Sequence, residues 1–193
     1  MRVIGLDLSL RATGLAVIDT DTRAIDLHVV KTAPAPAGSN ELAKALWTLE
    51  RFRQVASRIA AAEVLGAELV CVEGPSFGSK GGAADERAGL RWRVLHRLAV
   101  WNVPFALVPP STLKAYATGR GNSDKTAMVQ ATQRRLGDAC PDLPDDNATD
   151  ALWLALMAAH RVGAPLLDLP TTQADRMGAV AWPELLSDEE GVA

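Results

Sequence analysis

The sequence predicts an α/β protein in which a mixed β-sheet carries helices on both faces. Three β-type runs joined by short links fill the first part of the chain. Two short apolar runs follow, and each is of the kind that forms a buried parallel strand. Stretches with apolar residues at three- and four-residue steps separate and follow those runs, which indicates amphipathic helices.

The opening runs are Arg2–Leu8, Gly14–Asp19 and Ala24–Lys31. They are rich in β-branched residues, and the link between the last two, residues 20–23, has the composition of a hairpin turn. Links this short join antiparallel neighbours. We therefore expect three antiparallel strands.

Helix-linked strands follow. The spacing predicts a long helix from Glu41 to Gly66, and the buried strands are expected at Glu68–Val72 and Pro104–Val108. Further helices are expected over 85–102, from Pro109, from Asn122 or Ser123 to Leu136, and over 146–161. This order of elements matches the ribonuclease H-like fold, with three antiparallel strands and then parallel strands.

The 193 residues are enough for one domain with its own hydrophobic core. We expect that domain to cover residues 1–162. A C-terminal tail over 163–193, with three prolines and a polar end, is expected to be loosely ordered. No apolar run is long enough to cross a membrane and no signal-peptide pattern is present, so the sequence predicts a cytoplasmic protein.

Charge is segregated along the chain. Residues 76–135 carry ten basic and three acidic side chains, whereas residues 136–193 carry two basic and eleven acidic ones. A basic middle is typical of a polyanion-binding surface, although a chance fluctuation of charge is the alternative.

Acidic residues stand where a metal site would need them. Asp7 and Glu73 each end an apolar strand, and Asp146 and Asp150 share one side of the last long helix with Asn147. Alternatives are a strand-end acid bonded to a turn for Asp7, and compensation of the helix dipole for the helical acids. Carboxylates in this number favour Mg²⁺, with Mn²⁺ able to replace it. A pair of such ions would support in-line phosphodiester cleavage by these catalytic acids.

Basic and aromatic residues nearby predict contacts with nucleic acid. Expected contacts to phosphates come from side chains in the glycine-rich loop, the helix after it and the break near residue 120: Lys80, Arg87, Arg91, Lys114, Arg120 and Lys125. Phe77 stands in the same glycine-rich loop, where an aromatic ring could stack on bases or pack into the core. A solvated helix surface is the alternative for the arginines.

Five motifs in order resemble the RuvC family of Holliday-junction resolvases, most closely its phage-encoded branch. They span roughly residues 1–160: Ile4-Gly-Leu-Asp7 through Thr13-Gly14, Val70-Cys-Val-Glu73-Gly-Pro75, Val108-Pro-Pro-Ser-Thr-Leu-Lys114, Gly119-Arg-Gly-Asn-Ser-Asp-Lys125 and Asp145-Asp-Asn-Ala-Thr-Asp150.

The resemblance implies roles for individual residues. Asp7, Glu73 and Asp150 fall on metal-binding catalytic acids, Lys114 and Lys125 on DNA-contacting lysines, and Phe77 near an aromatic used at the junction centre. The family's remaining ligand falls on Asn147, and we expect Asp146 to replace it, with Asn147 as a weaker ligand.

The resemblance also implies a homodimer, because a four-way junction offers two symmetric cuts. Apolar helix positions expected to supply the interface are Leu90, Val94 and Trp101.

Three alternatives differ in function class. A kinase or actin-like ATPase shares the Asp7…Thr13-Gly14 pattern, but 193 residues leave no room for its second domain, so no nucleotide cofactor is expected. A broader nuclease would cut flaps, forks or RNA–DNA hybrids with the same acids. A protein that binds junctions without cutting would follow if Asn147 left the metal site incomplete.

Overall fold

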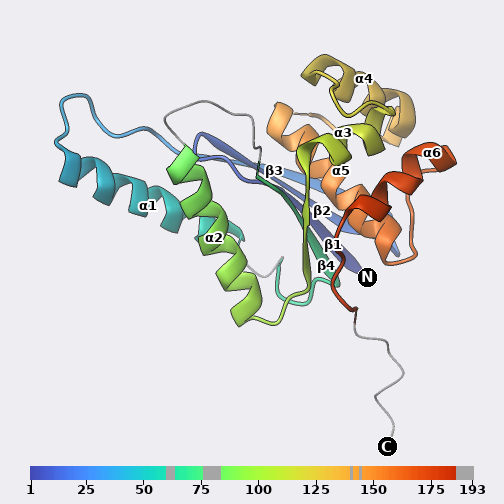
Figure 1. Ribbon diagram of the computed structural model, residues 1–193, viewed down its shortest axis with the longest axis horizontal. Coiled ribbons are helices and arrows are strands. Elements are labelled where there is room, and N and C mark those ends of the chain that lie inside the picture. Colours follow the sequence, from blue (N-terminus) through green and yellow to red (C-terminus); the bar gives the residue numbers. More distant parts are fainter. Residues whose placement is uncertain (60–63, 76–83, 140, 144, 186–193) are drawn as a thin grey trace, which may run out of the picture.

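A five-stranded mixed sheet forms the centre of the molecule (Figure 1), in a computed structural model that describes residues 1–59, 64–75, 84–139, 141–143 and 145–185. The strand order is β3-β2-β1-β4-β5, in which β1 pairs antiparallel with β2 and parallel with β4. The β2–β3 pair is antiparallel and the β4–β5 pair is parallel, as the sequence predicts. The strands are β1 (Arg2–Asp7), β2 (Ala12–Asp19), β3 (Ile25–Lys31), β4 (Leu69–Glu73) and β5 (Phe105–Val108).

Helices cover both faces of the sheet (Figure 1). One face packs on α1 (Glu41–Ile59) and α2 (Ala84–Val100), and the opposite face packs on α5 (Asp146–Arg161). Side chains alternate along β1, so that Ile4 and Leu6 belong to the core under α1 and α2 while Val3 belongs to the core under α5. The remaining helices are α3 (Pro110–Thr118), α4 (Lys125–Leu136), the 3₁₀ turn η1 (Gly137–Ala139), α6 (Thr171–Ala174) and the 3₁₀ turn η2 (Asp175–Ala179).

Two glycines let α5 lie directly on the sheet. A Cβ atom on Gly5 would stand 2.0 Å from the Ala151 carbonyl oxygen, and one on Gly14 would stand 2.0 Å from the Asn147 carbonyl oxygen. Only hydrogen fits in such a space. The first two turns of α5 are therefore held against β1 and β2 by backbone contact.

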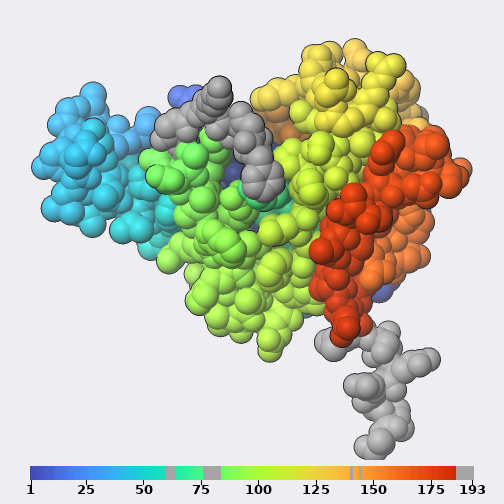
Figure 2. Space-filling view, viewed as in Figure 1, coloured from blue at the N-terminus to red at the C-terminus, as the bar shows by residue number. Residues whose placement is uncertain are grey.

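Helix α1 begins where the sequence predicts, but only its second half contacts the core. Phe52 and Val55 are buried, whereas the exposed fractions of the preceding apolar side chains are 68% for Leu42, 58% for Leu46 and 57% for Leu49. The expected helix to Gly66 is described only as far as Ile59, and residues 60–63 lie outside the described part of the chain. Figure 2 shows the first half of α1 and the preceding segment projecting from the rest of the molecule.

Two of the three residues that we expected at a dimer interface lie inside the chain. Leu90 and Val94 are buried in the core between α1, α2 and the sheet. Trp101 is half-buried, with the Arg97 guanidinium 4.8 Å from the centre of its ring. The expectation for Leu90 and Val94 was wrong, because their helical spacing marks the α2 face that packs on α1 and the sheet of the same chain.

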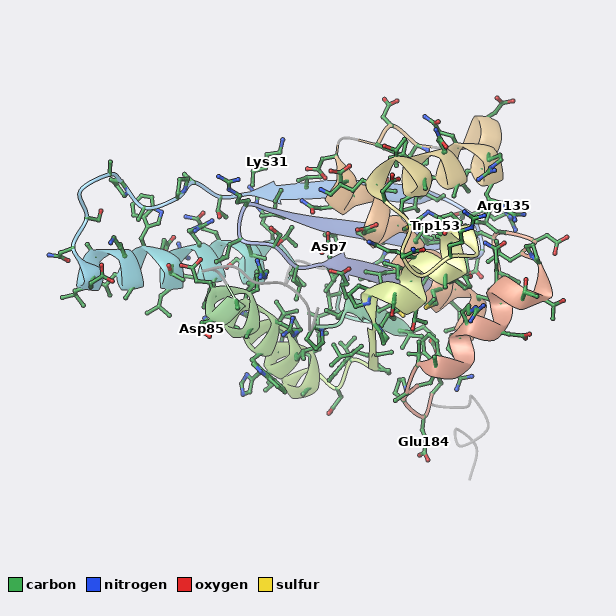
Figure 3. All side chains as sticks on the ribbon, turned by 45° about the horizontal axis from the view of Figure 1, so that its top comes forward. Asp7, Lys31, Asp85, Arg135, Trp153 and Glu184 are labelled. Atoms are coloured by element: carbon green, nitrogen blue, oxygen red, sulfur yellow. The ribbon has the colours of Figure 1, made fainter. Side chains whose placement is uncertain are left out.

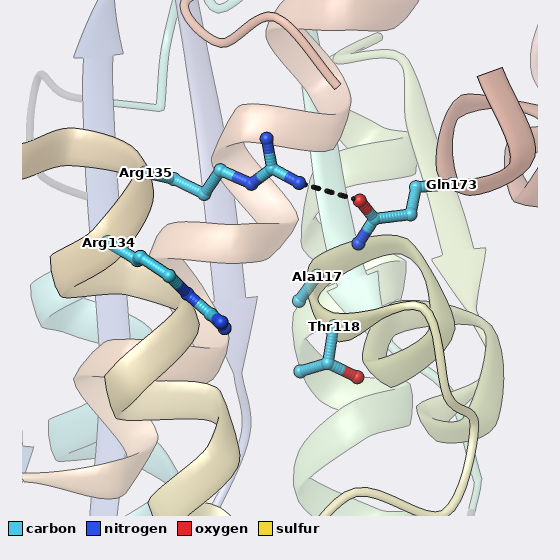
Figure 4. A pocket seen from close by; sticks show the side chains of 5 residues that line it. All are labelled: Ala117, Thr118, Arg134, Arg135 and Gln173. Atoms are coloured by element: carbon cyan, nitrogen blue, oxygen red, sulfur yellow. Dashed lines mark hydrogen bonds between the residues drawn. The ribbon is translucent and has the colours of Figure 1, made fainter. Parts of the chain in front are cut away.

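The segment after α5 packs on α3, which differs from the loosely ordered tail that we expected. Gln173 of α6 is buried, and its side chain donates to the Tyr116 carbonyl at 3.1 Å and accepts from Arg135 at 3.0 Å. Figure 4 shows Arg135 and Gln173 facing one another at a cavity of about 240 Å³ that Arg134 also lines. Residues 186–193 lie outside the described range, and the expected domain boundary at residue 162 stays a prediction.

None of the helices in the described ranges is long and apolar enough to cross a lipid bilayer.

Candidate active site

Two carboxyl groups meet where β1 and β4 end. These parallel neighbours are in register, with Leu6 opposite Val72, so the residue that follows on each strand is an acid. Those acids are Asp7 and Glu73, and a hydrogen bond joins their carboxyl groups. The adjacent ends of parallel strands are a common place for a ligand site. Figure 3 shows that Asp7 and Lys31 lie toward one end of the sheet and that Arg135 lies toward the other.

The first turn of α5 brings further acids to the same place. Asp7 pairs with Gly14 on β2, and the Asn147 backbone lies directly over that glycine. Asp145 caps the helix, because its side chain accepts a hydrogen bond of 3.0 Å from the Ala148 amide. Asp145 therefore has a local role in capping the backbone of α5 at its N-terminus.

Acidic and basic side chains line one cavity of about 210 Å³. Glu73 and Asp150 line it from different elements, and Lys114 of α3 lines it as well. Asp146 forms an ion pair with Lys125, whose Nζ lies 2.7 Å from Oδ2. Asn147 is not among the residues that line the cavity, which are Glu73, Pro110, Lys114, Lys125, Met128, Asp146, Thr149 and Asp150.

Burial raises the pKa values of three carboxyl groups, and the charges of neighbouring carboxylates add to the rise at Asp7 and Asp150. Burial raises the pKa of Asp7 well above its usual value, and the charges of Glu73 and Asp150 raise it further. Burial, with the charge of Glu73, raises the pKa of Asp150 to about 7. Burial also raises the pKa of Glu73, although its hydrogen bond with Asp7 and the charges of Lys114 and Arg91 oppose this rise. The site therefore concentrates carboxyl groups whose negative charge is offset in part by Lys114, Lys125 and Arg91.

The chemistry of these donors fits a hard divalent cation. Carboxylate oxygens are the ligands that Mg²⁺ and Mn²⁺ prefer, and a cation would offset the burial of these carboxylates and the repulsion that Asp7 and Asp150 feel from their neighbours. Within the described ranges, no three carboxylate, histidine or cysteine side chains are already drawn around one point. A bound ion would thus require these side chains to turn toward it.

Only some of the expected DNA-binding residues lie at the cavity. Lys114 and Lys125 line the cavity, and the charge of Arg91 acts on Glu73 from α2. Arg87 is half-buried near the start of α2, and Arg120 is exposed in the loop between α3 and α4. Phe77 and Lys80 lie outside the described residues.

Two features of the site were missed by sequence reasoning. Gly14 permits the approach of α5 to Asp7, and a glycine within a β-type run was the available signal. Arg51 of α1 is buried and donates a hydrogen bond to the Leu10 carbonyl in the segment that follows Asp7, and no pattern in the sequence indicated a buried arginine there.

Curated proteins named RuvC are similar in sequence to this chain. A protein named crossover junction endodeoxyribonuclease RuvC from Synechococcus sp. (strain CC9311) is 30% identical over 170 residues, covering 81% of this chain and 96% of the relative. The chain belongs to the RuvC family. A RuvC protein from Clavibacter michiganensis subsp. michiganensis is 31% identical over 206 residues, covering 94% of this chain and 88% of the relative. A search of protein-family models found no match.

Solved structures of RuvC proteins share the fold. Thermus thermophilus RuvC has a TM-score of 0.63 and 22% identity, and the match covers 87% of this chain and 100% of that one. The same protein in complex with a Holliday junction substrate has a TM-score of 0.62 and 21% identity, over 87% of this chain and 99% of that one. The ribonuclease H-like fold expected for this member of the RuvC family is confirmed. Its place in the phage-encoded branch stays a prediction.

Proposed function

We propose that this chain is a crossover junction endodeoxyribonuclease, a metal-dependent enzyme that resolves four-way DNA junctions by paired phosphodiester cleavage. One observation carries the proposal. Glu73, Asp146 and Asp150 line a single cavity with Lys114 and Lys125 beside Asp7, which combines ligands for cations with partners for phosphate. The names of the relatives support the same activity.

The carboxylates hold the cations in this proposal. Asp7, Glu73 and Asp150 would supply oxygen ligands for two Mg²⁺ ions, for which Mn²⁺ could substitute. Ions held there would supply activation of a water molecule and neutralisation of the leaving oxygen in an in-line displacement. We assign the remaining ligand to Asp146 in preference to Asn147, because Asp146 lines the cavity and Asn147 does not.

The lysines bind and orient the DNA strand. Lys114 lines the cavity beside Glu73 and Asp150, which supports a contact between its ammonium group and the phosphate that is cut. Lys125 pairs with Asp146 in the absence of DNA and would exchange this partner for a phosphate oxygen. Arg87, Arg91 and Arg120, together with Phe77 and Lys80, stay predicted contacts to the junction.

A homodimer would place two such sites on the two symmetric strands of a junction. In place of Leu90 and Val94, we assign the interface to the exposed apolar face of α1, formed by Leu42, Leu46 and Leu49. This face precedes Phe52 and Val55 along α1, which pack in the core of the chain. A second copy that covers the face would therefore extend this core across a two-fold axis.

The test is cleavage of a labelled four-way junction in Mg²⁺ or Mn²⁺, beside a linear duplex, a Y-fork and a flap. We expect symmetric nicks on the junction alone, and loss of cutting with retained binding for Asp7→Asn and Glu73→Gln. Asp138→Asn, an exposed acid of η1, is the matched control and should cut like the wild type.

Each other outcome has a definite meaning. Equal cutting of forks and flaps would replace the proposal with a broader branch-specific nuclease. Binding without cutting would make the chain a junction-holding protein. Loss of cutting in Asn147→Ala but not in Asp146→Asn would reverse our assignment of the remaining ligand.

A further inference from the structure

Arg51 is a buried charge that the proposed chemistry does not use. Its exposed fraction is 8%, and none of the described carboxylates forms an ion pair with it. Burial of a guanidinium group costs several kcal/mol unless hydrogen bonds compensate. The acceptors of the Arg51 hydrogen bonds should therefore indicate why a charged residue is buried at this position.

One hydrogen bond of Arg51 goes to the turn that follows Asp7, and the other goes to Thr32, which itself bonds to that turn. Its guanidinium donates from NH2 to the Leu10 carbonyl at 2.8 Å and from Nε to the Thr32 hydroxyl at 2.8 Å. The Thr32 hydroxyl in turn donates to the Leu10 carbonyl, and the Thr32 amide donates to the Arg11 carbonyl at 3.3 Å. Arg51 thus ties α1 and the residue after β3 to one short turn.

The same turn is fixed from its other side. The Thr13 hydroxyl donates to the Ser9 carbonyl at 2.6 Å and accepts from the Ser9 amide at 3.3 Å. Residues 8–11, which we call the Arg11 turn, are therefore held at both ends by buried side chains. This backbone lies between Asp7 on β1 and the start of β2, at the edge of the sheet that carries the proposed site.

The Arg11 turn presents one cation. The Arg11 side chain is exposed, and its guanidinium has no hydrogen-bond or ion-pair partner in the described ranges. The strand register places Lys31 opposite Ala12, so a second exposed cation stands beside the turn. Lys114, by contrast, follows β5 on the other side of β1 in the strand order.

We propose that Arg11 contacts a backbone phosphate of bound junction DNA, and that Arg51 is the positioning residue that fixes the Arg11 turn for this contact. The inference rests on the proposed function and extends it. A strand lying over Asp7 would be held by Lys114 and Lys125 on one side and by Arg11 on the other. A preordered turn lets this contact form without an entropic cost of ordering the backbone.

The test measures binding of a fluorescent four-way junction at several salt concentrations without divalent metal. Arg11→Gln is expected to weaken binding and to lower the slope of log K against log salt by about 1. Arg58→Gln is the matched control, because Arg58 is an exposed arginine in the last turn of α1. That turn lies at the other end of the sheet, beside Trp101 before β5 begins.

A second comparison separates positioning from stability. In an Arg51→Lys background, Arg11→Gln should change the slope by less than half of its effect in the wild type. Thr32→Val should act like Arg51→Lys, and Thr32→Ser, which keeps the hydroxyl, should restore the effect. These variants are compared at a temperature where thermal melting shows each of them folded.

Three results overturn the inference. An unchanged slope in Arg11→Gln, or equal changes in Arg11→Gln and Arg58→Gln, removes the phosphate contact. A full Arg11→Gln effect in both the Arg51→Lys and the Thr32→Val backgrounds removes the positioning role. A wild-type protein that binds no junction overturns the proposed function and this inference together, whereas the first two results leave the proposed function standing.

Discussion

Asp150 is a residue for which protons and the proposed metal ion would compete. Its pKa is raised to about 7 from an ordinary value of 3.8, by burial and by the charge of Glu73. Between these two pH values the folded chain binds a proton that the unfolded chain has lost. The contribution of Asp150 to stability is therefore present at low pH and is lost as the pH rises from about 4 to about 7.

The loss of stability with rising pH leads to a prediction for the metal-free protein. Asp150→Asn should raise the melting temperature at pH 8 relative to the wild type, because it removes a buried charge. It should have little effect at pH 5, where the wild-type carboxyl is already protonated. Thermal melting in EDTA at both pH values is the measurement, and a variant that melts lower at pH 8 would contradict the predicted repulsion.

Divalent cations should make the wild type melt at a higher temperature than Asp150→Asn at pH 8. Mg²⁺ is expected to raise the melting temperature of the wild type more at pH 8 than at pH 6, because binding must displace the shared protons. Asp150→Asn should lose most of this gain. An equal gain in both proteins would mean that the cation binds elsewhere.

Helix α5 is the element that joins the site to the sheet. Its small residues and the glycines beneath them let backbone touch backbone, and its first turn delivers Asp146 while Asp150 follows one turn later. Helices usually rest on sheets through side chains that can repack, but a collision with a carbonyl oxygen cannot be relieved by a rotamer change. The geometry of the acids therefore depends on two positions that carry no side chain.

Gly5→Ala tests this dependence. The new methyl group would meet the Ala151 oxygen and the Ala155 nitrogen, 2.0 and 2.5 Å away, so we expect a loss of about 3 kcal/mol or more in the free energy of unfolding. Gly178→Ala is the control, since no atom lies within 4 Å of its Cβ position, and it should stay within about 0.5 kcal/mol of wild type. Urea unfolding measures both, and a Gly5→Ala protein as stable as this control would refute the close contact.

Much of the element order could be predicted, since strand and helix periods are local. The adjacency of Asp7 and Glu73 also followed from local information, because each acid ends a strand and parallel neighbours end at one edge. The partners of the helices could not be predicted in the same way. An apolar stripe on a helix indicates that this face packs against something, but it does not show whether the partner is the same chain. Leu90 packs in the core of its own chain, whereas Leu46 is exposed.

At the scale of the whole molecule, the exposed face of α1 is the feature that the single chain does not account for. Leu42, Leu46 and Leu49 form one side of a helix whose next turns enter the core. Apolar side chains grouped in this way commonly mark an interface. A second copy is the partner that we assign to them.

If the proposed dimer forms through this face, Leu46→Glu should convert it into monomers and leave the fold intact, because the side chain is exposed in the single chain. Light scattering after size-exclusion chromatography measures the mass. Leu65→Glu introduces the same change at an exposed leucine outside this face and should stay dimeric. The monomer is expected to nick one strand of a junction without the paired cut, and an unchanged mass would remove α1 from the interface.

The sheet separates two hydrophobic cores, and this division affects how the protein can change. The acids depend on the layer built from α5, whereas the face assigned to self-association belongs to the layer built from α1 and α2. Substitutions in the core of one layer can affect the packing of the other layer only through the strands between them. A designer could therefore fuse two copies, or exchange the α1 surface for an unrelated pairing module, without rebuilding the chemistry on the opposite side.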